Sequence, residues 1–155
     1  FDKVYAPKTG ELTFDGTQVR EILAEGLVDT STITIEELMA IDSLNMTDEH
    51  RDQLAQRIAA SAESSIVVTH GTDTMPETAR YLHRLGRQVG ERAVVLTGAM
   101  RPYSFGNSDA PMNLASAVAY SRLLDPGVYV AMNGRYFDAD NVLKDKALGI
   151  FTELQ

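Results

Sequence analysis

Three short apolar runs alternate with helical patterns along the second half of the chain. The runs are SSIVVTH, AVVLTG and GVYVAMN, each of a length and β-branched content typical of a buried strand. The first helical pattern begins after Thr74, which has capping-box spacing to Glu77, and it ends at Gly86. The second runs over residues 109–124 and has a proline near its start and another just after its end.

Strands that alternate with helices in this way indicate right-handed βαβ units and a parallel sheet. We therefore expect a doubly wound, three-layer α/β fold of the Rossmann or flavodoxin-like kind, with a mainly parallel sheet. Because no repeat, low-complexity segment or long linker interrupts the pattern, residues 1–155 are expected to form a single domain.

The first third of the chain has a weaker pattern. Residues 1–16 carry a Pro-Lys-Thr-Gly turn signal and are expected to form an extended loop or a hairpin. A short amphipathic helix is expected over residues 18–27. Residues 32–39 open with alternation at Ile33 and Ile35, which favours a strand.

A further helix is expected just before the first apolar run. Thr47 is its expected N-cap, and Leu54 and Ile58, four residues apart, mark the face that it buries.

Composition and charge narrow the class of protein. Hydrophobic residues make up 44% of the chain and charged residues 23%, as in ordinary globular domains. The formal net charge of −8 and the absence of a Lys/Arg cluster argue against a nucleic-acid partner. No apolar run is long enough to span a membrane. We therefore expect no nucleic-acid partner and no membrane partner, and instead a soluble enzyme that acts on a small molecule.

The chain has no cysteine, which excludes disulfides, thiolate catalysis and Cys-ligated zinc. Its three histidines are His50, His70 and His83, and they lack metal-ligand spacing. No metal site is therefore expected. His70 is interpreted as a hydrogen-bonded turn residue and His83 as a helix-surface residue.

Ligands of doubly wound domains bind beyond the carboxyl ends of the strands. Residues 69–74, 97–109 and 133–145 come directly after the three expected strands, so all three segments should lie on one rim of the sheet.

The first rim segment, THGTDT, carries candidate chemistry. Gly71 permits close backbone approach, Thr72 offers a hydroxyl and Asp73 a carboxylate. A threonine hydroxyl needs a base, and a neutral lysine beside an aspartate can serve as one. Lys144, on the third segment, is a candidate if it reaches Thr72. The alternative is that the Thr, Asp and Gly residues only cap the next helix, and that Lys144 is a solvated surface residue.

Arg101, on the second rim segment, has two interpretations. It could bind a substrate carboxylate, but a structural ion pair is the favoured interpretation.

Four segments together resemble the bacterial-type L-asparaginases. VVTHGTDTMPETARYL resembles the second signature of that family, and VVLTGAMRP with SDAPMNL after it resembles the segment that comes next. DSLNMTDEHR is similar to the substrate-loop segment, and ADNVLKDK to the catalytic-lysine segment. The matches run in order over about residues 40–146. The resemblance implies the fold of the asparaginase N-terminal domain.

The resemblance also implies roles for individual residues. Thr72, Asp73 and Lys144 match a catalytic triad in which Thr72 is the nucleophile or positions the attacking water, and Lys144 is its base. Asp73 would hold Lys144 and the α-ammonium group of the substrate. Ser43 matches the residue that binds the substrate α-carboxylate. Ala99 lies in the segment whose backbone approaches the scissile amide.

Departures from the family pattern lead to further expectations. The family opens with a strand that ends in Thr-Gly-Gly-Thr, whose last Thr is the primary nucleophile, and FDKVY resembles the residues directly after that Thr. We hypothesise roughly ten to fifteen further residues ahead of Phe1, without which the sheet would expose an apolar slot. The chain resembles the short, single-domain members of the family, so we expect it to lack the smaller C-terminal domain of the larger members. Leu44 stands where the larger members have Gln, and Tyr5 is a candidate for the mobile-loop tyrosine.

Two functions are consistent with these observations. The first is an amidohydrolase of the L-asparaginase type, which converts L-asparagine to L-aspartate and ammonia and is expected to need no metal and no organic cofactor. The second is a non-catalytic module that binds Asp or Asn and acts in regulation or assembly. For either, the resemblance implies a cytoplasmic homodimer or higher homo-oligomer.

Overall fold

A four-stranded sheet forms the centre of the computed structural model, which describes residues 1–86 and 89–154. The strand order is β3-β4-β5-β6, over Ser65–Thr69, Ala93–Thr97, Gly127–Met132 and Arg135–Asp138. The first three strands are parallel, with Val67 opposite Val95 and Val95 opposite Tyr129. The fourth is antiparallel to β5. The expected α/β fold with a mainly parallel sheet is confirmed.

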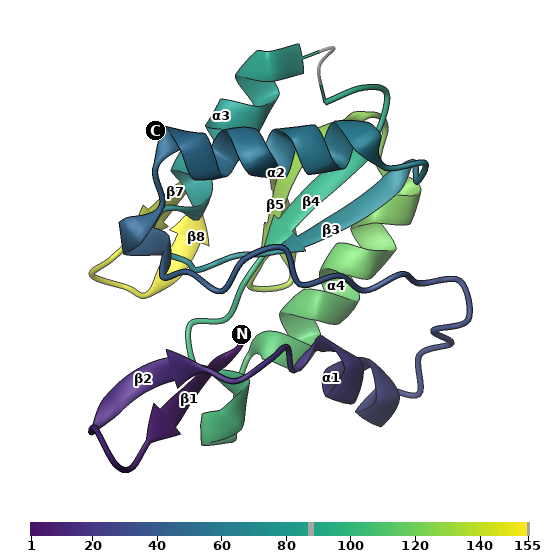
Figure 1. The fold of residues 1–155 in the computed structure, drawn as a ribbon. Helices are drawn as coiled ribbons and strands as arrows, with labels where there is room; N and C mark the ends of the chain where they lie inside the picture. The colour runs from purple at the N-terminus through teal and green to yellow at the C-terminus, as the bar shows by residue number, and fades with distance from the viewer. Residues whose placement is uncertain (87–88, 155) are drawn as a thin grey trace.

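Helices cover both faces of the sheet (Figure 1). On one face, α2 (Asp48–Ala60) and α3 (Met75–Leu85) pack through Leu54, Ile58 and Leu82 against strand residues such as Val94 and Val130. On the other face lie α4 (Ala110–Leu123) and the short α1 (Val19–Glu25). Burial of these apolar side chains is the main free-energy gain of the fold.

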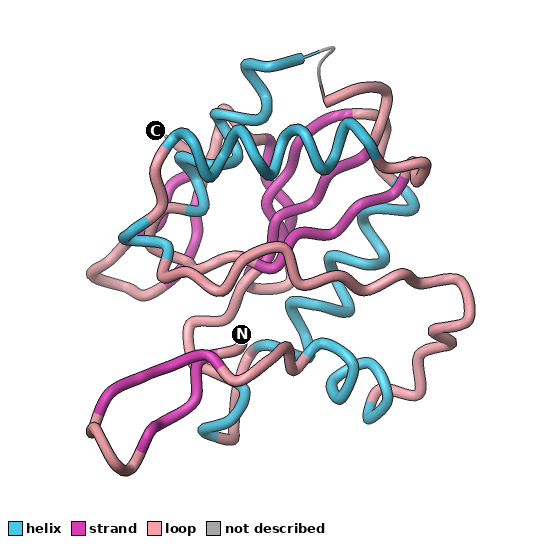
Figure 2. The backbone as a smooth tube through the Cα atoms, viewed as in Figure 1, coloured by secondary structure: helices cyan, strands magenta, loops and turns pink. Residues whose placement is uncertain are grey.

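The remaining elements are short. A hairpin of β1 (Lys3–Ala6) and β2 (Glu11–Phe14) extends from the body, as Figure 2 shows. A second small antiparallel pair consists of β7 (Leu143–Asp145) and β8 (Ile150–Thr152). Single 3-10 turns occur over Ser43–Asn45 and Tyr103–Phe105. The hairpin and the helix expected near the amino terminus are thus confirmed, the helix over a shorter range.

The expected strand over residues 32–39 is wrong, because this segment has no regular secondary structure. Its alternation is real, since Ile33 and Ile35 are half-buried against the α1–α4 cluster while Thr32 and Thr34 are exposed. Alternation therefore reports which side chains are buried, and it does not show that a strand partner exists.

Thr74 occupies the N-cap of α3, but the expected capping box with Glu77 is absent. The Thr74 hydroxyl instead donates 2.7 Å to the carbonyl oxygen of Ser43. Thr47 is the N-cap of α2 as expected, and its N–H donates to Nδ1 of His50 at 3.0 Å. The Thr74 hydroxyl, which the local pattern assigned to a helix cap, thus makes a tertiary contact with Ser43 instead.

The strand β3 is less buried than the sequence indicated. All five residues of β4 are buried, whereas Ile66, Val67 and Val68 of β3 are only half-buried. The reason is topological, because β3 lies at the edge of the sheet with β4 as its one strand neighbour in the described chain.

Candidate active site

A groove of about 990 Å³ runs along β3 and reaches the rim at the carboxyl end of the sheet. Six of the eight residues that sequence analysis assigned to the site line it: Ser43, Gly71, Thr72, Asp73, Ala99 and Lys144. They come from four separate segments of the chain. The groove is therefore the candidate active site.

Lys144 lies at the centre of the polar part of the groove. Its Nζ is 2.8 Å from Oγ1 of Thr72 and 2.8 Å from Oδ1 of Asp73. The Lys144 side chain is 11% exposed, and that of Asp73 is 40% exposed. An amine in this position can exchange a proton with the threonine hydroxyl while the carboxylate holds it in place.

The route of the chain explains how Lys144 arrives there. After β5 the backbone reverses at Asn133 and Gly134, which have φ of +56° and +73°. Strand β6 then runs back along the sheet, so that Asp138 lies opposite Tyr129. The middle of residues 133–145 therefore leaves the rim, contrary to expectation, and β7 brings Lys144 back to it.

Ser43 contacts Gly71 so closely that only glycine fits there. A Cβ on Gly71 would lie 2.5 Å from Oγ of Ser43 and 2.6 Å from its Cβ. Ser43 itself is 3% exposed. The bond from Thr74 to the Ser43 carbonyl fastens the same turn to the start of α3. Gly71 therefore sets how near the Ser43 turn comes to Thr72.

The Ser43 turn is also held from its other side. The Asp42 carboxylate accepts the backbone N–H of Leu44 at 3.0 Å and pairs with the ammonium group of Lys3. The Lys3 side chain and the Leu44 N–H together lower the pKa of the Asp42 carboxyl. Sequence analysis missed Asp42, because 39 residues separate it from Lys3.

The second rim segment is organised by Asp109 and Asn113, which sequence analysis also missed. The Asp109 carboxylate accepts the N–H groups of Met100 and Arg101 at 3.0 Å each. Nδ2 of the buried Asn113 donates to the carbonyl of Gly98 at 2.9 Å and to Asp109 at 2.8 Å. The four-residue spacing between Asp109, the N-cap of α4, and Asn113 was the available signal. Ala99, between these anchors, is half-buried in the groove wall.

His70 is a buried turn residue, as expected. Its Nδ1 is 2.7 Å from the carbonyl oxygen of Gly71, so Nδ1 carries the proton. Nε2 has no hydrogen-bond partner in the described chain. Burial lowers the pKa of the imidazole, and the Gly71 carbonyl opposes this in part. His83 is exposed on α3, also as expected.

Two expected substrate-binding residues lie away from the groove. Leu44 is 67% exposed, Tyr5 on β1 is 57% exposed, and neither lines the groove. Arg101 donates to the carbonyl of Phe105 at 3.1 Å, and no acidic partner lies within salt-bridge distance in the described chain. The favoured interpretation of Arg101 as an ion-pair residue is wrong.

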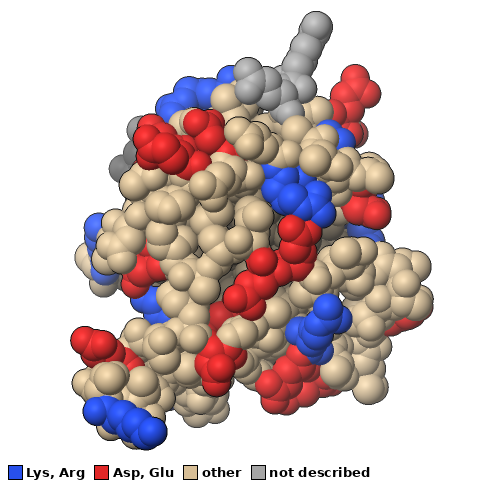
Figure 3. Space-filling model, in the orientation of Figure 1, with Lys and Arg blue, Asp and Glu red and all other residues tan. Residues whose placement is uncertain are grey.

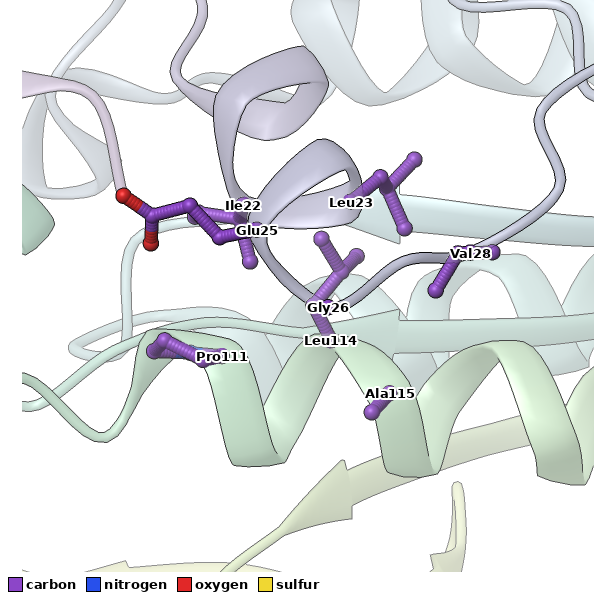
Figure 4. A pocket seen from close by; sticks show the side chains of 8 residues that line it. All are labelled: Ile22, Leu23, Glu25, Gly26, Val28, Pro111, Leu114 and Ala115. Atoms are coloured by element: carbon purple, nitrogen blue, oxygen red, sulfur yellow. The ribbon is translucent and has the colours of Figure 1, made fainter.

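A second hollow lies between α1 and α4 and has a volume of about 320 Å³ (Figure 4). Its lining is apolar except for Glu25, whose carboxylate accepts the hydroxyl of Tyr103. That bond raises the pKa of Tyr103 to about 12. With no nucleophile and base in contact, this hollow is a weaker candidate than the groove along β3.

Three further findings concern surface charge, metal ligands and membrane-spanning helices. Acidic side chains form a band across the face shown in Figure 3. In residues 1–86 and 89–154, no group of three His, Cys, Asp or Glu could hold a metal ion. No helix in these ranges is long and apolar enough to cross a bilayer.

Comparison with known proteins shows the family to which the chain belongs. The family model for the N-terminal domain of asparaginase matches residues 4–151. A probable periplasmic L-asparaginase of Haemophilus influenzae is 38% identical over 95% of this chain, and L-asparaginase 2 of Escherichia coli is 34% identical over 81%. The chain therefore belongs to the asparaginase family.

Solved structures show the same fold. The thermostable L-asparaginase from Thermococcus kodakarensis superposes with a TM-score of 0.77 at 27% identity, over 98% of this chain and 47% of that one. A probable cytoplasmic L-asparaginase from Campylobacter jejuni gives 0.73 at 33% identity, over 91% and 46%. The chain spans 42% of the Haemophilus protein and 37% of the Escherichia protein. It thus corresponds to less than half of each relative.

Proposed function

We propose that this protein is an L-asparaginase-type amidohydrolase, which converts L-asparagine to L-aspartate and ammonia. The observation that carries the proposal is the position of Lys144, whose amine contacts both the Thr72 hydroxyl and the Asp73 carboxylate. In this arrangement the hydroxyl can act as a nucleophile, the amine as its base, and the carboxylate as the group that orients the amine.

The chemical steps can be written from these contacts. In the proposed step the amine of Lys144 accepts the proton of the Thr72 hydroxyl, and Oγ1 attacks the amide carbon. The C–N bond breaks, and the proton passes to the departing ammonia. Water then attacks the acyl ester. A proton of this water passes through Lys144 to Oγ1 of Thr72, and aspartate is released. If Thr72 instead positions the attacking water, as the family resemblance also implies, Thr72 and Lys144 together activate that water.

Substrate recognition is assigned to the residues around this centre. Asp73 is bonded to Lys144 through Oδ1, so its second oxygen is available for the substrate α-ammonium group. The hydroxyl of Ser43 is a donor for the α-carboxylate. Ala99 lines the groove, and we propose that the backbone beside it binds the oxygen of the scissile amide.

Assembly and location are part of the same proposal. We propose that the protein acts in the cytoplasm as a homodimer or larger homo-oligomer. The relatives' names include both a periplasmic and a cytoplasmic enzyme.

The test is ammonia release from L-asparagine by the full-length gene product, with Thr72→Ala as its control. Release that disappears in the control supports a threonine-dependent amidohydrolase. No release from either protein, together with a rise in melting temperature on adding aspartate, would indicate the non-catalytic binding module and refute the proposal.

A further inference from the structure

Asn133, in the turn after β5, is bonded through its side chain to the hairpin that carries Lys144. Its Oδ1 accepts the backbone N–H of Phe151 at 3.0 Å. Phe151 lies opposite Lys144 in the β7–β8 pair and is 2% exposed. The backbone N–H of a buried residue needs an acceptor, and here the acceptor comes from the turn after β5. The bond therefore holds the β7–β8 hairpin against the end of β5.

The backbone of Asn133 is held from another side by Asn113 of α4. The Asn133 N–H donates to Oδ1 of Asn113 at 3.1 Å, and Nδ2 of Asn113 donates to the Gly98 carbonyl at 2.9 Å. Asn133 has a φ of +56°, in the left-handed region that asparagine adopts more readily than most residues. This position thus has two requirements, tolerance of a positive φ and a side-chain acceptor for Phe151.

Gly98 completes the connection, because it packs against the turn that carries Thr72. A Cβ on Gly98 would lie 3.1 Å from Cγ2 of Thr72, so glycine lets the end of β4 approach this turn closely. From Gly98 the contacts continue through Asn113 and Asn133 to the β7–β8 hairpin. There the Lys144 amine lies 2.8 Å from the Thr72 hydroxyl, which closes the circle of contacts.

We infer that Asn133 is a positioning residue for Lys144. It acts through Phe151, whose place in β8 sets where the hairpin lies and therefore how near the Lys144 amine comes to the Thr72 hydroxyl. The effect on catalysis rests on the proposed function, because that function makes Lys144 the base. The effect on the place of the amine does not depend on it and can be measured separately.

Two substitutions of Asn133 separate its side-chain bond from its backbone conformation. Asn133→Gly removes the acceptor, while glycine keeps a positive φ without strain. Asn133→Asp keeps an acceptor oxygen, and aspartate also tolerates this conformation. Asn107→Gly is the matched control, since Asn107 is exposed and also has a positive φ, of +48°. Thermal unfolding of the full-length gene product shows that each variant is folded.

The first readout is the rate at which acetic anhydride labels Lys144 relative to the exposed Lys146, followed by tandem mass spectrometry. The Lys144 side chain is 11% exposed and bonded to Asp73, so its labelling should be slow in the unsubstituted protein. In Asn133→Gly we expect labelling of Lys144 to be roughly tenfold faster, as for local opening of a segment. Asn133→Asp and Asn107→Gly should label like the unsubstituted protein.

The second readout is steady-state hydrolysis of L-asparagine by the same proteins. Misplacement of a reacting group by about 1 Å can lower the rate by roughly 10²-fold, and we expect a fall of this order in kcat for Asn133→Gly. KM should stay within about threefold, because the groups assigned to substrate binding are unchanged. Asn133→Asp should restore kcat, whereas a protein weakened only in its fold would not recover through the acceptor oxygen alone.

The outcomes distinguish this inference from the proposed function. Equal labelling of Lys144 in Asn133→Gly and the unsubstituted protein would overturn the inference, whatever the activities. Equal effects of Asn133→Gly and Asn133→Asp would also overturn it, since the acceptor oxygen would then have no part. If the unsubstituted protein releases no ammonia, the proposed function fails, and the labelling rates still decide whether Asn133 sets the place of Lys144.

Discussion

Lys144 donates to the hydroxyl of Thr72 at 2.8 Å across 72 residues of sequence. Thr72 lies in the turn after β3, and Lys144 lies on β7 after the chain has run back along β6. A contact between two side chains brought together by separate elements is easier to disturb selectively than a core contact. Substitutions at these two positions therefore test chemistry with little change in the fold.

Thr72→Val should abolish amide hydrolysis while Thr72→Ser preserves it. Valine keeps the shape of threonine but has no hydroxyl for Lys144 to deprotonate. We expect kcat to fall by roughly 10³-fold or more in the valine variant, as for loss of one member of a catalytic unit. Steady-state kinetics on L-asparagine gives the comparison, and equal loss in both variants would count against a role for the hydroxyl.

Gly71→Ala should displace the Ser43 turn. Its new Cβ would lie 2.5 Å from Oγ of Ser43 and must push that residue away. We expect a higher KM for L-asparagine and a loss of about 1–3 kcal/mol in the free energy of unfolding. Gly26→Ala is the matched control, since its Cβ would meet no atom closer than 3.4 Å. Similar KM values in the two variants would contradict the role assigned to Gly71.

Asn113→Ala should destabilise the protein by about 2–4 kcal/mol. The amide of this 1% exposed side chain donates to Gly98 and Asp109 and accepts the N–H of Asn133 at 3.1 Å. Its removal leaves the buried carbonyl of Gly98, after β4, without this donor and the Asn133 N–H, after β5, without this acceptor. Urea denaturation measures the loss, with the exposed Gln56→Ala as a control that should change stability by less than about 0.5 kcal/mol.

Stability should fall as the pH falls below about 6.5, the ordinary pKa of histidine, because burial lowers the pKa of His70 in the folded protein. Between these two pKa values the unfolded chain binds a proton that the folded chain does not, so unfolding becomes more favourable. The slope is at most about 1.4 kcal/mol per pH unit for one group. Urea denaturation at a series of pH values should show that His70→Gln reduces this slope and His83→Gln does not. An unchanged slope in His70→Gln would assign the effect to other groups.

The parts of the fold that could be predicted are those with local signals. The alternation of β3, α3, β4, α4 and β5 was readable because each buried strand and amphipathic helix has its own periodicity. Residues 32–39 failed because alternation reported the burial of Ile33 and Ile35 without a partner strand. The antiparallel β6 was not foreseen, because it has only four residues and its pairing with β5 depends on the turn at Asn133.

The candidate site was less predictable from local pattern. Nothing in the turn THGTDT distinguishes a helix cap from a nucleophile, and a lone lysine is usually solvated. The ordered resemblance suggested that Thr72 and Lys144 belong together, and folding brings them into contact. The bonds of Asp42 to Lys3 and of Thr74 to Ser43 had no sequence signal, since each depends on how distant loops pack.

The most direct measurement is ammonia release from L-asparagine by Lys144→Met compared with Lys146→Met in the full-length gene product. Lys146 is exposed, two residues from Lys144, and its replacement removes the same charge from the same segment. The proposed mechanism predicts loss of turnover in Lys144→Met and near-normal turnover in Lys146→Met, with similar melting temperatures. Normal turnover in Lys144→Met would contradict the assignment of this lysine as the base for Thr72.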